Sequence, residues 1–149
     1  MSNTTPDQKA KALGLVLDPR PERPFLNLCA RVGKLLYTSG HTSEIRGKVG
    51  QDLTVEQGYT AARQAMSAVL RSIYLEAGSF NKVRIVKLLG CVNATPDFKD
   101  CSKVINGASD LVHEIFGKEA NGYHARSALG FATLPAGVAV EVEAICELL

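Results

Sequence analysis

The longest regular pattern of apolar residues lies in the middle of the chain, in the run TVEQGYTAARQAMSAVLRSIYLEAG. Its apolar side chains recur at the three- and four-residue spacing of an amphipathic helix, at Val55, Ala62, Met66, Val69 and Ile73. Thr54 and Gln57 occupy the two positions of a capping box, and Gly78 is typical of a helix end. We therefore predict a helix over residues 54–78.

A second amphipathic run, PDFKDCSKVINGASDLVHEIFG, predicts another helix, with its main stretch from about Ser102 to Phe116. Between the two helices lies KVRIVKLLGCVNA, which is typical of a strand. Its apolar residues fall in both alternating sets: Val83, Ile85 and Leu89 in one, and Val86, Leu88 and Val92 in the other. A strand that is apolar on both faces is expected at the centre of a sheet and covered from both sides.

The two ends of the chain carry shorter elements. Thr5, Pro6 and Gly14 are placed to begin and end a short helix, and the proline-rich run LDPRPERP after it should be extended. The run FLNLCARVGKLLYTSG predicts two strands joined near Gly33. The run HTSEIRGKVGQDL predicts a loop, which could be a lid or could contain a short strand. The final run, YHARSALGFATLPAGVAVEVEAICELL, predicts two more strands around the turn LPAG.

The order of these elements predicts an α+β fold. After the N-terminal helix the order is strand, strand, helix, strand, helix, strand, strand, so that each long helix connects two strands. Right-handed crossovers would place both helices on one face of one mixed sheet. The other face would then be open, although the central strand is apolar on both sides. The N-terminal segment could cover that face, but a second copy of the chain is the better candidate, and we expect an oligomer.

The register of the last two strands can be predicted from burial. In a hairpin with an even loop, Phe131 pairs with Val140 and Leu129 pairs with Val142, which makes one face continuously apolar. The face away from the helices would then carry Arg126, Ala128, Gly130, Glu141 and Glu143. Arg126 and Glu141 would lie roughly 13 Å apart along the strands, and a small anion could bind in the hollow between them. In the simpler interpretation, these residues are solvated surface charges.

Composition limits the classes of function. A chain of 149 residues with 46% hydrophobic and 21% charged residues suits one globular domain. The net charge of +2 argues against a nucleic-acid partner, which would require a basic face. No apolar run is long enough for a membrane helix, and the polar N-terminus predicts no secretory signal. Four scattered cysteines indicate free thiols in a reducing compartment, and hence the cytoplasm. Three histidines without ligand spacing predict no metal site.

Five segments together resemble one known family: LLYTSG, GYTAARQAMSAVLRSI, VNATPDF, VINGASDLVHEIFG and HARSALGFATLPAGVAVEVEAI. They are similar to segments of the Rid/YjgF family, also called endoribonuclease L-PSP or translation-inhibitor-like proteins. The motifs NGASDL and HARSA look like those of a YjgF-like subgroup. The resemblance covers residues 24–149 as a single domain and leaves residues 1–23 as an N-terminal arm. It implies a chorismate-mutase-like α+β fold and a homotrimer with clefts between its subunits.

The resemblance also implies an activity and a site. The family's best-established activity is the hydrolysis of reactive 2-imino acids, derived from enamines, to 2-keto acids and ammonia, without a cofactor. By this resemblance, Arg126 would bind the substrate carboxylate, and Glu141 would position or deprotonate the attacking water. Ser39 and Gly40, at the end of a strand, and Asn106 would line the cleft.

Two positions depart from the family pattern. The family's cleft tyrosine falls on Leu26, with Phe25 one position away, so that a hydroxyl is missing at either residue. The family's cysteine two places after the arginine is replaced by Ala128. The arginine itself is retained. We therefore keep Phe25 and Ala128 as candidate lining residues, whereas the identity of the substrate stays open.

Three functions remain open from the sequence. The first is an imine deaminase, and the second is a non-catalytic binder of small carboxylates, which the missing hydroxyl favours. The third is an endoribonuclease or translation inhibitor, as the family's other names suggest. The near-neutral charge and the absence of a basic, aromatic-rich strip argue against the third. We expect a small carboxylate and further copies of the chain as partners, and neither a membrane nor nucleic acid.

Overall fold

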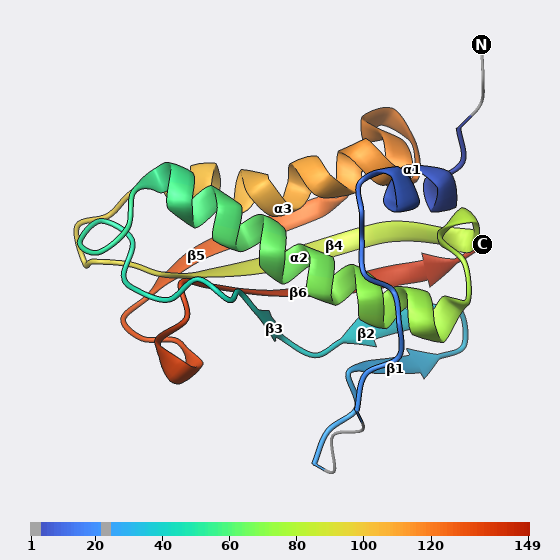
Figure 1. The fold of residues 1–149 in the computed structure, drawn as a ribbon, viewed down its shortest axis with the longest axis horizontal. Helices are drawn as coiled ribbons and strands as arrows, with labels where there is room; N and C mark the ends of the chain where they lie inside the picture. The colour runs from blue at the N-terminus through green and yellow to red at the C-terminus, as the bar shows by residue number, and fades with distance from the viewer. Residues whose placement is uncertain (1–3, 22–24) are drawn as a thin grey trace.

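The computed structural model describes residues 4–21 and 25–149, which form two layers (Figure 1). One layer is a mixed β-sheet. The other consists of α2 (Val55–Ala77) and α3 (Cys101–Phe116), which lie across the same face of the sheet. The shorter helix α1 (Pro6–Ala12) packs against α3. The predicted α+β class, with two long helices on one face of a mixed sheet, is confirmed.

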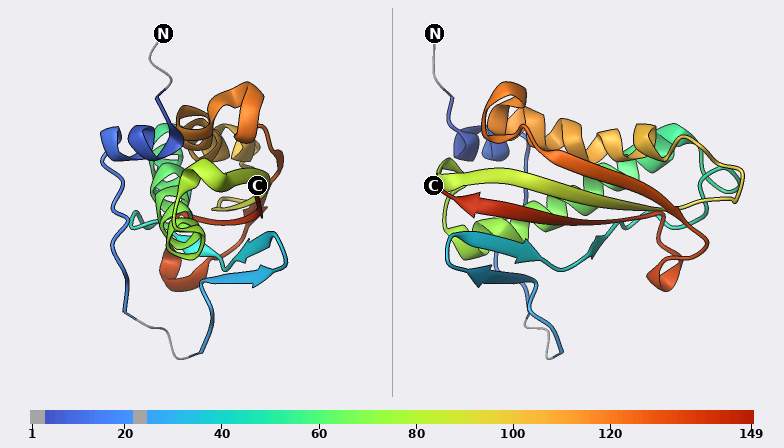
Figure 2. Two further views of the ribbon diagram at one scale, coloured as in Figure 1. Left: turned by 90° about the vertical axis from the view of Figure 1, so that its right-hand side faces the viewer. Right: turned by 180° about the vertical axis from the view of Figure 1, so that it is seen from behind.

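Within the described residues the sheet has six strands, in the order β1–β2–β6–β4–β5, with β3 beside β6 (Figure 2). The strands are β1 (Cys29–Val32), β2 (Leu35–Thr38), β3 (His41–Thr42), β4 (Val83–Asn93), β5 (Ala125–Phe131) and β6 (Val140–Leu148). Three short helical turns precede β4, β5 and β6: Phe80–Lys82 after α2, Gly117–Asn121 after α3, and Pro135–Gly137 after β5. The pair β4–β5 is parallel, and the other pairs are antiparallel. Because β4 has a partner on each side, it is the central strand that the sequence predicts.

The predicted hairpin of the last two strands is wrong. β5 and β6 do not pair with each other, because β4 lies between them and pairs with both. The physical reason is the crossover from β4 through α3, which returns the chain parallel to β4 at the edge of the sheet. The turn after β5 then passes the end of β4, where Asn93 donates a backbone hydrogen bond to Ala139. The pairing of Phe131 with Val140 therefore does not occur.

The N-terminal segment packs on the helix layer. Its helix α1 has a capping box between Thr5 and Gln8 and buries Ala10 completely. Beyond α1 the chain crosses α2, where Arg71 donates to the backbone carbonyl oxygens of Asp18 and Pro19 at 2.6 and 3.0 Å. The sequence allowed the N-terminal segment to cover the open face of the sheet, but the described part of the segment does not cover it.

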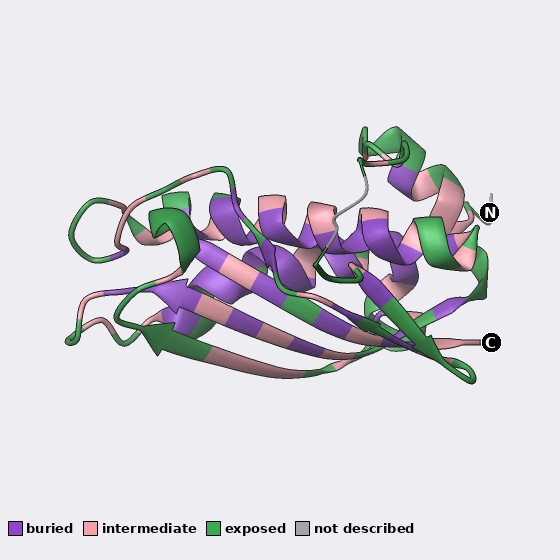
Figure 3. Cartoon of the chain, turned by 90° about the horizontal axis from the view of Figure 1, so that it is seen from below, coloured by how far each residue is buried: buried purple, intermediate pink, exposed green. Residues whose placement is uncertain are grey.

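The sheet face opposite the helices is only partly buried in the single chain (Figure 3). The pairing register places on it the apolar residues Leu35, Tyr37, Leu89, Cys91, Leu129, Phe131 and Ile145, together with the charged residues Arg84, Lys87, Glu141, Glu143 and Glu147. Of these, Tyr37, Leu129 and Phe131 are 40%, 47% and 41% exposed. We call this set the open sheet face. An exposed apolar surface of this kind is typical of a subunit interface.

The two long helices approach each other at backbone distance. A Cβ atom on Gly107 of α3 would overlap the backbone carbonyl oxygen of Tyr59 on α2. Beside this contact, the Tyr59 hydroxyl donates to Asp110 at 2.9 Å, and Arg63 forms an ion pair with Glu114. Gly107 therefore fixes the position of α3, and with it the side chains that α3 directs towards β5.

We predict that Gly107→Ala destabilises the protein by about 1–3 kcal/mol or more, because the rigid backbone of α2 would have to move. Gly58→Ala is the matched control. Its Cβ would meet side-chain methyl groups, of Val104 at 3.0 and 3.2 Å and of Val49 at 3.3 Å, and a side chain can move by a few tenths of an ångström more easily than a backbone. The better helix propensity of alanine offsets part of that cost. Urea unfolding of both variants measures the difference, and equal midpoints would contradict the backbone contact.

Candidate functional site

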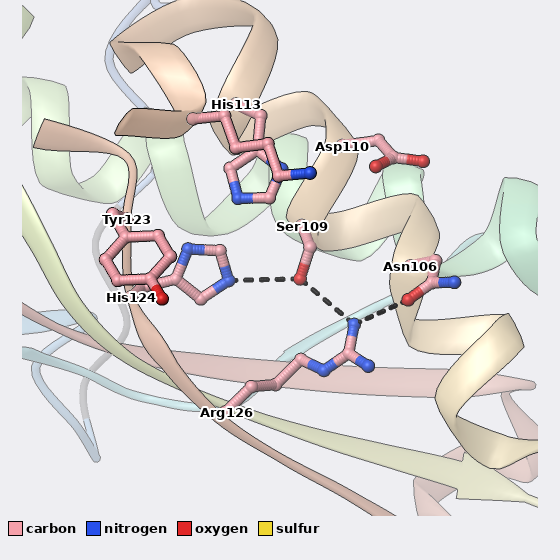
Figure 4. A pocket seen from close by; sticks show the side chains of 8 residues that line it. Asn106, Ser109, Asp110, His113, Tyr123, His124 and Arg126 are labelled. Carbon is pink, nitrogen blue, oxygen red and sulfur yellow. Dashed lines mark hydrogen bonds between the residues drawn. The ribbon is translucent and has the colours of Figure 1, made fainter. Parts of the chain in front are cut away.

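A polar pocket of about 380 Å³ lies between α3 and the chain that leads into β5 (Figure 4). The side of α3 that faces it contributes Asn106, Ser109, Asp110 and His113. The other wall contributes Lys118, Tyr123, His124 and Arg126. We call this space the Arg126 pocket. The α3 residues lie three or four positions apart, which places them on one side of a helix, and His124 and Arg126 lie two apart on one side of an extended chain.

Arg126 points towards α3. It is in register with Leu88 of β4, which is completely buried below the helices, so the two side chains share that face of the sheet. Its Nη1 atom donates to Asn106 Oδ1 at 2.9 Å and to Ser109 Oγ at 3.1 Å. Among the described residues, no carboxylate forms an ion pair with it. The prediction that Arg126 lies on the face away from the helices is wrong, whereas Asn106 and Arg126 do lie together.

His124 links Arg126 and Ser109 to the turn before β5. Its Nδ1 lies 2.6 Å from the Gly122 carbonyl oxygen, and its Nε2 lies 3.0 Å from Ser109 Oγ. A carbonyl oxygen only accepts hydrogen bonds, so the neutral ring carries its proton on Nδ1. Nε2 then accepts the hydroxyl hydrogen of Ser109, whose oxygen in turn accepts from Arg126.

The pocket favours an anion. Burial is the main cause that lowers the pKa of both His113 and His124, and the positive charge of Arg126 lowers each pKa further. The carboxylate of Asp110 raises the pKa of His113 in opposition, but it also accepts the hydroxyl of Tyr59. With Arg126 and Lys118 on the walls, a small anion would find two cations and several hydrogen-bond donors.

Glu141 lies on the other side of the sheet. It is in register with Cys91 on the open sheet face, and its negative charge contributes to raising the pKa of that thiol, after burial. Gly40 follows β2 and lies against Glu141, since a Cβ atom on Gly40 would overlap Glu141 Oε1. Ser39 stands next to Gly40 and donates its hydroxyl to the Asn27 carbonyl oxygen at 2.6 Å. Ser39, Gly40 and Glu141 are thus brought together, but the predicted hollow shared with Arg126 does not exist within one chain.

The two remaining candidates lie outside both groups. Phe25 is 95% exposed, and its neighbour Leu26 is 50% exposed. Ala128 packs against the hydrophobic core. Phe25 could therefore line a cleft only if a further copy of the chain packs against it. Ala128 is not among the residues that line the Arg126 pocket.

Sequence reasoning missed Ser109, His113 and His124. The helical spacing of Asn106, Ser109 and His113 was available in the sequence, as was the alternation of His124 with Arg126. Each pattern places its residues on one side of an element. Only the pairing of β5 with β4 shows that these two sides face each other. Within residues 4–21 and 25–149, no group of three potential ligand side chains is placed to bind a metal ion.

Comparison with known proteins agrees with the fold. The family described as endoribonuclease L-PSP matches residues 17–148. Protein TCP17 of Trypanosoma cruzi is 41% identical over 145 residues, covering 91% of this chain and 89% of that protein. Atu1372 of Agrobacterium tumefaciens, a crystal structure of unknown function, is 33% identical with a TM-score of 0.85, covering 97% and 92% of the two chains. The YjgF gene product of E. coli is 28% identical with a TM-score of 0.58, covering 88% and 93%.

These relatives share one fold, but this chain superposes on Atu1372 with a higher TM-score than on the YjgF gene product. The predicted YjgF/L-PSP fold is therefore confirmed. In the described ranges, no helix has the length and apolar character needed to cross a membrane.

We predict that the pKa of His124 lies below 6.5 and that its neutral ring is the Nδ1-protonated tautomer. Arg126→Met should raise that pKa, because the substitution removes a nearby positive charge, although burial continues to lower it. NMR correlation of the imidazole nitrogens and protons across a pH titration measures both properties. Arg84→Met, which changes an exposed arginine of β4 outside the pocket, is the control. A wild-type pKa above 6.5 would contradict the electrostatic description.

Proposed function

The chain belongs to the endoribonuclease L-PSP family, and we propose that it binds small 2-imino or 2-keto acids through Arg126 and hydrolyses the imino acids to keto acids and ammonia. The observation that carries this proposal is the guanidinium of Arg126. It is held in a polar pocket by neutral partners, Asn106 and Ser109, and not by a carboxylate. A buried or half-buried cation in such surroundings gains most from an anionic ligand.

The geometry of Arg126 suits a carboxylate. Its Nη1 atom is occupied by Asn106 and Ser109, whereas Nη2 has only a long contact of 3.4 Å to the Ser102 carbonyl oxygen. Within the described residues, Nε has no hydrogen-bond partner. A carboxylate could therefore bind with one oxygen at Nε and the other at Nη2, which is the bidentate arrangement that arginine prefers.

A complete site requires more than one chain. Arg126 and Glu141 lie on opposite faces of the sheet, and the open sheet face around Glu141 is apolar enough to be an interface. We propose a homotrimer in which each boundary joins Arg126 of one chain to Ser39, Gly40 and Glu141 of the next. Four free cysteines are consistent with such an assembly working in the cytoplasm.

The reaction needs little more than orientation. Arg126 would hold the substrate carboxylate, which fixes the position of the neighbouring imine carbon. The Glu141 carboxylate would accept a proton from water as the water oxygen attacks that carbon. Glu141 then returns that proton to the nitrogen, which gives a carbinolamine. The hydrogen of its new hydroxyl group passes to the nitrogen by way of Glu141 as the carbon–nitrogen bond breaks, and ammonia and a 2-keto acid are released. No cofactor takes part in these steps.

A second function, binding of carboxylates without catalysis, is favoured by the separation of Arg126 from Glu141 in the chain. If assembly does not join them, the Arg126 pocket can bind an anion while no carboxylate activates water. The endoribonuclease activity in the family's name has weaker support, because the net charge of +2 provides no extended basic surface for RNA.

We predict that the protein is a trimer, with a mass three times that of the 16.0 kDa chain by light scattering. Leu129→Asp should shift it towards a folded monomer, because this side chain lies on the open sheet face and is 47% exposed in the single chain. Val16→Asp is the control, since Val16 is 62% exposed but belongs to the N-terminal segment. A wild-type protein that stays monomeric at micromolar concentration would contradict the assembly.

We also predict that two substitutions separate binding from catalysis. In a coupled assay, a dehydratase generates 2-aminoacrylate and the release of pyruvate is followed. Glu141→Gln should abolish the acceleration but retain affinity for pyruvate. Arg126→Lys should weaken that affinity by about tenfold to a hundredfold, because an ammonium group cannot reproduce the bidentate contact.

Glu143→Gln provides the matched control, since Glu143 lies on the same strand and face as Glu141 but is exposed. Calorimetry with pyruvate gives the affinities, and thermal melts confirm that each variant is folded. If Glu141→Gln is as fast as the wild type, Glu141 is not the base. If a folded Arg126→Lys protein binds pyruvate normally, the carboxylate site lies elsewhere.

A further inference from the structure

The Arg126 pocket contains a serine whose hydroxyl group is held between a base and a cation. Arg126 Nη1 donates to Ser109 Oγ at 3.1 Å, and Ser109 Oγ lies 3.0 Å from His124 Nε2. Because a guanidinium only donates hydrogen bonds, the Ser109 oxygen accepts from it and keeps its own hydrogen for Nε2. His124 Nδ1 donates to the Gly122 carbonyl oxygen at 2.6 Å, which fixes the ring. This is the arrangement of an activated nucleophile: a hydroxyl, a base and a third group that orients the base.

A second pair in the chain has the same hydrogen bonds but different surroundings. His41 lies 2.7 Å from both the Ser39 carbonyl oxygen and Ser72 Oγ. His41 and Ser72 are each only 4% exposed, between β3 and α2. Ser109 is also largely buried, at 6% exposed, but it and the half-buried His124 line the 380 Å³ pocket. A serine can therefore hold a histidine ring in place without a pocket beside it, and the pocket beside Ser109 is a separate feature.

The electrostatics of the pocket suit a base at neutral pH. The pKa of His124 is lowered, chiefly by burial, and further by the charges of His113 and Arg126, against the opposing effect of the Gly122 carbonyl group. Its Nε2 lone pair is therefore available at pH 7. The guanidinium of Arg126 donates to Ser109 Oγ and so stabilises the partial negative charge that this oxygen gains as its proton moves to His124.

We propose that Ser109 is a nucleophile activated by His124, and that the pocket cleaves small activated esters whose acyl group carries a carboxylate. Ser109 Oγ attacks the ester carbonyl carbon while its proton moves to His124 Nε2. The carbon–oxygen bond to the leaving group then breaks, and His124 returns the proton to that oxygen. Water, deprotonated by His124, next attacks the acyl-serine, and Ser109 takes the proton back as the free acid leaves.

The charge of the pocket sets the class of substrate. Two cations, Arg126 and Lys118, line it, against one carboxylate, that of Asp110. An acyl group with its own carboxylate gains an ionic contact that a neutral acyl group lacks. This activity goes beyond imine hydrolysis and uses neither an imine nor Glu141.

The experiment uses the full-length protein and two esters, mono(4-nitrophenyl) succinate and the neutral 4-nitrophenyl acetate. The succinate ester should release nitrophenolate in a burst of one equivalent per chain, and mass spectrometry of peptides should place the succinyl group on Ser109. The acetate should react at least about tenfold more slowly, because it lacks a charge-assisted contact. The burst rate should fall as the pH drops through the pKa of His124, because the protonated ring cannot act as a base.

Three variants test the assignment. Ser109→Ala should lose the burst, and Ser109→Cys should keep acylation at the same position. His124→Gln should slow it by about a hundredfold or more. Ser127→Ala is the control, because Ser127 is next to Arg126 in β5 but lies on the opposite face, where its hydroxyl accepts from Lys87.

Several results would overturn the proposal: no burst with the wild-type protein, an acyl group on another residue, or an unchanged burst in Ser109→Ala. If Ser109→Ala does not fold, Ser109→Cys and His124→Gln decide, and unchanged acylation in a folded His124→Gln protein refutes the role of the base. Because this assay contains no imine, its outcome is separate from the release of keto acid in the coupled assay.

Discussion

The parallel pairing of β4 with β5 is the constraint on which the candidate site depends. The two strands are connected through α3, so β5 lies at the sheet edge beneath that helix. The register then pairs Arg126 with Leu88, which is buried below the helix layer. A shift of one residue would turn Arg126 to the opposite face and replace it with an uncharged neighbour. The position of one guanidinium thus follows from a long-range choice of strand partner.

The same choice separates the two charged groups that the family resemblance places in one cleft. β6 lies on the other side of β4, and Glu141 faces away from the helices, next to Gly40. Arg126 near α3 and Glu141 on the open sheet face would each supply half of the proposed deaminase site. For this reason the proposed deaminase is tied to assembly, whereas carboxylate binding and the chemistry of Ser109 need only one chain.

The Arg126 pocket is a connected set of hydrogen bonds in which Ser109 has the central position. Its oxygen accepts from Arg126 and its hydrogen is donated to His124, while Asn106 holds the guanidinium from the next turn of α3. Leaving such groups unpaired away from water would cost about 1–3 kcal/mol each. These hydrogen bonds therefore fix the side chains that form them, and both Arg126 and Ser109 line the Arg126 pocket.

The sequence by itself determined the elements whose signals are local. The capping box of Thr54 and Gln57 and the end at Gly78 span single turns, and α2 begins and ends there in the structure. The apolar pattern of β4 correctly predicted a central strand, although a β-bulge between Ile85 and Lys87 places Val83, Ile85, Leu88 and Val92 on one face and not on two. The family motifs also predicted that Asn106 and Arg126 lie together, as they do.

Only the tertiary structure decided which sides of these elements meet. The prediction of a hairpin between β5 and β6 assumed that strands adjacent in sequence pair with each other and that their register makes one face apolar. Both assumptions are reasonable for an isolated pair of strands. The crossover through α3 gave β5 a different partner, and no local pattern carries that information. Burial periodicity acts over a few residues, whereas strand pairing depends on how helices and strands pack together. The side of the sheet on which Arg126 lies was therefore a property of the whole fold.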